Sequence, residues 1–185
     1  MKTRKILFLF LACSLTFLET KAGTLRVPKQ HTTIQSAIDA AKTGDAIIVS
    51  PGTYRERLRL KPGLIVRSDG NDDKGKTGLR RAEATVLDYP EGTGPGVEMA
   101  EGSILDGFTV TGVGNFDEQL WQHHFDTRGD EQAHEPIGAE GVPGIAVSTD
   151  CEVRNNIVHH IDYTGIAITG GSPLISGNIC FRNMG

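Results

Sequence analysis

The sequence predicts an all-β fold, built as a parallel β-solenoid with one short helix near its amino end. Three observations predict it. Hydrophobic residues after position 45 recur with the period of strands, Gly and Pro separate short segments, and the carboxyl-terminal part repeats every 21 or 22 residues. The 185 residues, 38% hydrophobic and 23% charged, suit one domain and exclude a disordered tail, a long coiled coil and a polytopic membrane protein.

The first 22 residues have the pattern of an export signal. Basic residues precede the apolar run 6–18, which is too short to span a bilayer comfortably, and 20–22 is a cleavage site that ends on a small residue. We therefore expect a signal peptide at 1–22, a secreted, periplasmic or cell-surface domain at 23–185, and no stable membrane span after cleavage; the alternative is an uncleaved anchor. The mature domain has a net charge of −7, which argues against a general nucleic-acid binder.

A short helix is expected over 34–41, because its apolar residues fall on one helical face. Thr32 and Gln35 have the spacing of a capping box, and Gly44 is placed to end the helix. The next segment, 46–50, predicts a buried strand that ends at a Pro-Gly turn. No further helix of useful length is predicted.

The following strand has one apolar and one basic face, because Arg57, Arg59 and Lys61 alternate with two leucines. It belongs to a basic stretch, 55–81, with a net charge of +5. Arg binds carboxylates in a bidentate manner, so a basic outer face suits an anionic polysaccharide. The alternative is a solvated face that also protects an edge strand.

The solenoid prediction depends on a repeat in which 144–162 aligns with 165–184. An earlier copy covers 97–110. Each turn of about 22 residues would contribute three short strands that pair with the next turn at roughly 4.8 Å. The pairs expected to stack at a spacing of 22 are Val153 with Ile175, Asn156 with Asn178, and Val158 with Cys180.

Asn156 and Asn178 are predicted to form a ladder, since Asn tolerates a left-handed turn and its amide can bond to the amide in the next turn. Cys151 and Cys180 occupy different places in the repeat. We therefore expect two buried, unbonded thiols.

Three segments carry a family resemblance. AIDAAKTGDAIIVSPGTYRER (37–57) resembles the opening of right-handed parallel β-helix proteins of the pectin-lyase-like superfamily. ILDGFTVTG (104–112) and GIAITGGSPLISGNICFRN (165–183) resemble repeats of carbohydrate-binding and sugar-hydrolase β-helices. The resemblance implies a right-handed β-helix whose amino end is closed by the 34–41 helix. The catalytic residues of pectin methylesterases, pectate lyases and polygalacturonases have no recognisable counterpart.

An acidic insertion, 112–143, interrupts the repeat and has a net charge of −6. Within it, His123, His124 and Asp126 are candidate ligands for a divalent metal ion. Trp121 is a candidate platform for stacking a sugar. The alternatives are a solvated acidic loop and an aromatic residue that fixes this loop to the body of the domain.

His159 and His160, followed by Asp162 and Tyr163, could supply a general acid and base. However, His159 aligns with Phe181 in the next turn, which favours a stacking position on the surface.

Two function classes remain open at this stage, because fold does not fix function. The first is a lyase or hydrolase acting on an acidic polysaccharide that lies along the outer face of the solenoid. The second is a non-catalytic cell-surface or glycan-binding module. A third hypothesis, a periplasmic accessory factor for metal-site assembly, rests on a resemblance to periplasmic β-helix proteins of that role and on the His-rich insertion. The final turn is predicted to be uncapped, which implies the amino-terminal part of a longer solenoid or end-to-end contact with a partner.

Overall fold

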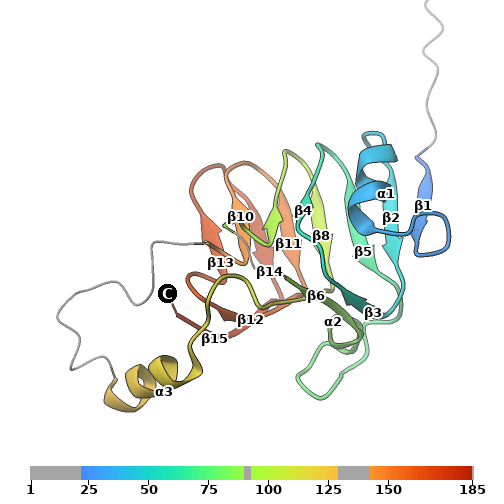
Figure 1. Cartoon of the computed structure of the whole chain (residues 1–185). Helices are drawn as coiled ribbons and strands as arrows, with labels where there is room; N and C mark the ends of the chain where they lie inside the picture. Colours follow the sequence, from blue (N-terminus) through green and yellow to red (C-terminus); the bar gives the residue numbers. More distant parts are fainter. Residues whose placement is uncertain (1–21, 90–92, 129–141, 185) are drawn as a thin grey trace, which may run out of the picture.

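The computed structural model describes residues 22–89, 93–128 and 142–184, so the expected signal peptide lies almost entirely outside the described residues. The described chain is mostly β and forms three parallel sheets. From β2 onward, each successive strand joins the first, then the third, then the second sheet, and this cycle repeats to the end of the chain. The chain therefore coils, and Figure 1 shows the strands of successive turns stacked side by side. This arrangement is compatible with the expected solenoid.

The strands are short, and each sheet collects one strand from each turn. The first sheet has six strands: β1 Thr24–Val27, β2 Ala46–Val49, β5 Ile65–Ser68, β8 Ile104–Asp106, β11 Glu152–Arg154 and β14 Leu174–Ser176. The second has four: β4 Leu58–Arg59, β7 Val97–Glu98, β10 Ile145–Val147 and β13 Ile166–Ile168. The third has five: β3 Gly52–Tyr54, β6 Thr85–Asp88, β9 Thr109–Thr111, β12 Ile157–Ile161 and β15 Ile179–Asn183.

The register predicted from the repeat is confirmed. Val153 pairs with Ile175, and Val158 pairs with Cys180. The earlier copy is also in register, since Leu105 pairs with Val153. Inward side chains of successive turns thus stack into one core, which includes Val66, Leu105 and Val153, all without exposed surface.

The amino end of the core is covered by α1 (Ile34–Ala40), which confirms the predicted helix. The capping box is formed by Thr33 and Ser36, one residue later than the Thr32 and Gln35 that we expected, because Thr33 is the residue whose extended backbone aims its hydroxyl at the Ser36 N–H. The helix ends at Ala41, so Gly44, with a φ of +90°, belongs to the following turn instead.

The carboxyl end of the described chain lacks such a cover. The repeat predicts that Val153, Val158, Ile175 and Cys180 are all buried. Val153 and Val158 are, but Ile175 is only half-buried and Cys180 is exposed. The prediction of a buried Cys180 was wrong because β14 and β15 have a partner strand on one side only within the described residues. Both cysteines are unbonded, as expected, and Cys151 is buried.

The asparagine ladder is confirmed, with one correction. The Asn156 N–H and Nδ2 both donate to Oδ1 of Asn178, at 2.9 and 3.0 Å. Asn156 itself is fully buried, and its Oδ1 accepts from the Phe108 N–H. The left-handed backbone, however, belongs to the preceding positions, Asn155 and Gly177. The role of Asn156 is therefore hydrogen bonding, and Asn155 is the residue whose short side chain tolerates the turn.

Two helices were not predicted: α2 (Arg80–Ala84) and α3 (Glu118–Thr127). The α3 helix lies inside the acidic insertion. Asp117 caps it by accepting from the N–H groups of Gln119 and Leu120. None of its residues is buried, and its apolar residues are only Leu120, Trp121 and Phe125, which give a short amphipathic signal.

Candidate functional site

A groove of about 490 Å³ lies where α1 meets the edge of the second sheet. It brings together side chains that are distant in sequence, from α1, β4, the segment before β7, and β7 itself. Its walls combine two guanidinium groups, two carboxylates and an amide with a few apolar atoms. The lining residues are Gln35, Asp39, Arg57, Leu58, Arg59, Gly94, Pro95 and Glu98.

Arg59 is the most exposed of the predicted basic residues, with 77% of its side chain accessible. It lies directly opposite Glu98 in the parallel pairing of β4 with β7. Its Nε donates to Oε2 of Glu98 at 2.6 Å and one Nη donates to Oε1 at 3.3 Å. This hydrogen bond raises the pKa of Arg59, so the residue stays cationic. The result is an exposed bidentate ion pair on the groove wall.

Arg57 lines the same groove but is held more firmly. Its Nη1 donates to the carbonyl of Pro95 at 3.0 Å, and its guanidinium carbon lies 5.8 Å from the centre of the buried Tyr89 ring. The contact with an aromatic face fixes the direction of the guanidinium group.

The amide of Gln35 closes the free edge of β4 from the α1 side. It accepts from the Arg59 N–H at 2.9 Å and donates to the Arg59 carbonyl at 3.3 Å, as a neighbouring strand would. The same Nε2 also donates to Asp39, one helical turn along. These bonds hold α1 and β4 at a fixed distance and so fix the width of the groove.

Lys61, the third predicted basic residue, does not line the groove. Its Nζ donates to the carbonyls of Asp39 and Ala41, at 3.1 and 2.6 Å. These groups are at the carboxyl end of α1, where a cation satisfies unpaired carbonyls and the helix dipole. Glu56 has the matching role at the other end, where it accepts from the N–H groups of Ile34 and Gln35. Lys61 therefore supports the helix that forms one wall.

The candidate metal ligands lie on α3. His123 and His124 are neighbours whose ring centres lie 5.7 Å apart, and Asp126 accepts from Nε2 of Gln122. Within the described ranges, no group of three or more His, Cys, Asp or Glu side chains is arranged to hold a metal ion. His134, in the same insertion, lies outside those ranges.

Trp121 is placed against other side chains of the chain. Its ring stacks on Phe125 at 5.1 Å, and the guanidinium of Arg182 lies 5.0 Å over it. The contact with Arg182 attaches α3 to β15, which favours the anchoring role over the sugar platform that we also considered.

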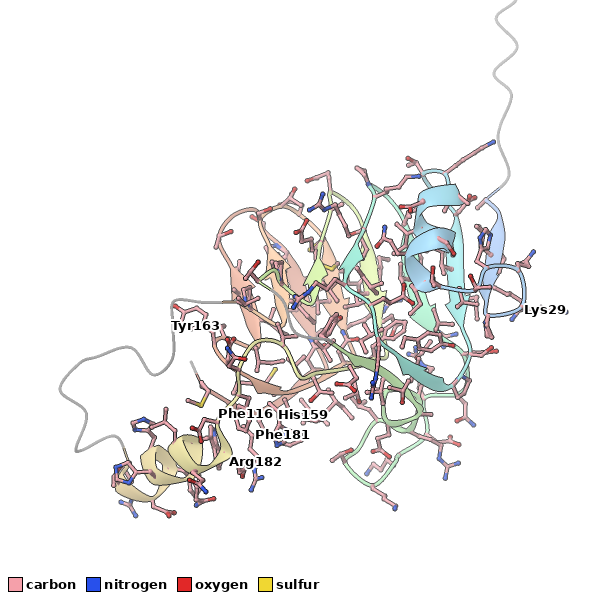
Figure 2. The ribbon with its side chains drawn as sticks, viewed as in Figure 1. Lys29, Phe116, His159, Tyr163, Phe181 and Arg182 are labelled. Atoms are coloured by element: carbon pink, nitrogen blue, oxygen red, sulfur yellow. The ribbon has the colours of Figure 1, made fainter. Side chains whose placement is uncertain are left out.

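The stacking of His159 on Phe181 is confirmed, with ring centres 5.0 Å apart and planes 23° from parallel. Figure 2 shows the two rings next to Phe116 and Arg182, whereas Tyr163 lies well away from them. Asp162 accepts from the backbone N–H of Asn115. Burial and the neighbouring His160 lower the pKa of His159, so its imidazole is neutral at neutral pH.

His160 and Arg182 occupy equivalent positions in successive turns of the solenoid. Both have a left-handed backbone, with φ of +54° and +49°. The equivalent residue one turn earlier is Gly112, with φ of +72°. Both longer side chains reach Glu118 of α3: Arg182 at 2.7 Å and Nε2 of His160 at 3.5 Å. This pair of contacts explains why residues other than glycine are tolerated at strained positions.

Sequence reasoning missed Gln35, Asp39 and Glu98 as groove residues. Glu98 lies 39 positions from Arg59, so the repeat of 21 or 22 residues does not connect them, and only the pairing of β4 with β7 brings the two together. Gln35 and Asp39 carry a weak signal, since they lie on the polar side of the predicted helix.

No helix in the described part of the chain is long and apolar enough to cross a membrane. In comparisons with known proteins, no family model, no curated protein and no solved structure matches this chain.

Proposed function

We propose that this protein is an exported right-handed β-helix of the pectin-lyase-like type that binds acidic polysaccharide in the groove between α1 and the second sheet. The observation that carries the proposal is the pair of guanidinium groups, Arg57 and Arg59, on the walls of one open groove. Guanidinium groups bind the carboxylates of uronic acids, and Asp39 lines the groove beside them as an acceptor for sugar hydroxyls. Leu58 and Pro95 supply apolar surface for a ring.

Binding without turnover is the form of this function that the groove favours. A hydrolase needs a carboxyl group that is available for proton transfer. Both carboxylates of the groove are engaged instead, Asp39 by the Gln35 amide and Glu98 by Arg59. A glycan-recognition surface needs no group for proton transfer.

A binding panel tests the proposal. Polygalacturonate and the neutral polymer dextran are compared by isothermal titration calorimetry at low and at physiological salt. Polygalacturonate should bind more tightly, and its affinity should fall as salt rises, because exposed charges are screened over about 8–10 Å. Arg59→Ser should weaken polygalacturonate binding roughly tenfold.

The matched control is Lys74→Ser, which removes one exposed cation from the 69–84 segment and should leave the affinity unchanged. Lys61 is not a useful variant, since its loss would disturb α1. Equal binding of both polymers, or equal losses in the Arg59 and Lys74 variants, would refute an anion-binding groove.

A further inference from the structure

Arg59 is the most exposed cation of the groove, and in this structure it already holds a carboxylate. Glu98 binds it through two parallel N–H···O bonds, 2.6 and 3.3 Å long. This is the geometry in which Arg binds any carboxylate, including that of a uronic acid. The carboxylate of Glu98 therefore occupies the position that the carboxylate of an acidic sugar would take.

From this geometry we infer that Glu98 is an internal competitor for Arg59, and that an acidic glycan binds by displacing the Glu98 carboxylate from the guanidinium group. The inference rests on the proposed function of the groove and adds a specificity-determining residue to it. A ligand with its own carboxylate can replace both hydrogen bonds that Arg59 gives up. Glu98 would thus select carboxylated sugars over neutral ones, because neutral hydroxyls do not replace the charged hydrogen bonds between Arg59 and Glu98.

The exchange is energetically accessible because the pair is exposed. The Arg59 side chain is 77% accessible and the Glu98 side chain 37%. Exposed ion pairs of this kind contribute little, since water solvates both separated partners. The backbone of both residues is fixed by the β4–β7 pairing and by the Gln35 amide, so only two side chains need to move.

The ion pair of Arg154 with Glu152 does not share this position. Arg154 also bonds to a glutamate, Glu152, at 2.7 Å, but its Nε donates to the buried Asp106 as well. A ligand at Arg154 would have to disturb that buried carboxylate. The Arg154–Glu152 pair lies on the first sheet, outside the groove, and provides a matched comparison.

The test is a double-mutant cycle on polygalacturonate affinity, measured by isothermal titration calorimetry. Glu98→Gln should tighten binding roughly threefold to fivefold, the range expected when an exposed ion pair no longer competes. Glu152→Gln changes the net charge equally and should leave the affinity within twofold. In an Arg59→Ser background, Glu98→Gln should have no effect, because the competitor then has no target.

Each outcome separates the inference from the proposed function. If wild type binds no polygalacturonate, the proposed function fails, and the inference with it. If wild type binds but Glu98→Gln is neutral or weaker, Glu98 is no competitor and the inference alone fails. If Glu98→Gln tightens binding equally with and without Arg59, the gain comes from net charge and the exchange is refuted. Circular dichroism spectra that match wild type establish that each variant is folded.

Discussion

Two segments leave the stacked strands of this chain, and they are attached to them in opposite ways. Segment 69–84, which carries α2, is held by a buried charge. The Arg81 side chain is 2% exposed and donates to Oδ1 of Asp106 at 2.7 Å and to the Asp106 carbonyl at 2.9 Å. Asn155 and Arg154, one turn further along, donate to the same carboxylate. One buried carboxylate thus joins the segment to two turns.

The α3 helix is held from outside. Its contacts are the Glu118 pairs with Arg182 and His160, together with the rings of Phe116 and Trp121. The side chains of these pairs are between 32% and 49% exposed. In Figure 1, α3 projects from the body of the molecule, whereas α2 lies close under the third sheet.

The comparison shows that local charge does not reveal the role of a basic residue. Arg59 and Arg81 belong to the same basic stretch, yet one faces a groove and the other is sealed beneath the strands. A buried ion pair is costly to break, because removing one partner leaves the charge of the other buried and unsolvated. An exposed ion pair can exchange partners, since water solvates both groups. The following predictions test this contrast.

The largest effect is expected for Arg81→Met, which leaves the Asp106 carboxylate buried with fewer donors. The free energy of unfolding should fall by about 3–5 kcal/mol. Urea denaturation followed by circular dichroism measures it. Arg80→Met is the control, because Arg80 is exposed and only pairs with Asp73 at 3.8 Å; a similar loss in both variants would contradict a special role for Arg81.

Asn156→Ala should come next, with a loss of about 2 kcal/mol by the same measurement. The substitution leaves the Phe108 N–H without the Asn156 oxygen and ends the ladder to Asn178. Asn115→Ala, at an exposed position, should be silent. A change near zero at Asn156 would remove the ladder from the list of stabilising features.

Low pH should weaken the attachment of segment 69–84 to the stacked strands, because that attachment depends on the ionised Asp106 carboxylate. Burial alone would raise the pKa of Asp106, but hydrogen bonds from Arg81 and Asn155, and the charge of Arg81, hold it below its usual value. The stability from this group is therefore complete above the unfolded pKa of 3.8 and is lost as pH falls through the lower folded pKa.

Glu83 adds to this dependence, because its bonds from the Thr77 side chain and from the backbone of residues 76–78 lower its pKa to about 2. Between pH 5 and pH 2, the free energy of unfolding should fall less in Asp106→Asn than in wild type. If the free energy of unfolding fell equally with pH in both proteins, Asp106 would not be the source of the acid sensitivity.

The smallest effect is expected for Glu118→Gln on α3. The global free energy of unfolding should change by no more than about 0.5 kcal/mol, since the pairs are exposed. Hydrogen exchange should nevertheless be faster in α3, with no change in α2. Unaltered exchange in α3 would show that Glu118 does not hold the helix.

Much of the fold could be predicted because the sequence repeats with the spacing of successive turns. The stacked pairs Val153–Ile175 and Asn156–Asn178 follow from spacing alone. The prediction of a buried Cys180 considered only its inward position in the repeat and not the uncapped final turn that was also expected. The α3 helix was missed since its apolar residues, Leu120, Trp121 and Phe125, are few and lie within a strongly acidic insertion.

The groove was predicted only in part. Alternation placed Arg57 and Arg59 on the outer side of a strand, and both line the groove. The alternation could not show that Lys61 caps α1 or that Glu98 pairs with Arg59. The first contact joins residues 20 positions apart and the second joins residues 39 positions apart. Such contacts depend on the stacking of turns and not on the local pattern.

The most direct test of the central claim, that the groove binds acidic polysaccharide, is to map where a ligand lies. Amide chemical shifts of labelled protein are recorded while a short oligogalacturonate is added. We predict that the shifts that change most belong to Gln35, Arg59 and Glu98, with little change on the third sheet or α3. Changes centred instead on His159, Phe181 and Arg182, or spread evenly over the molecule, would contradict the account.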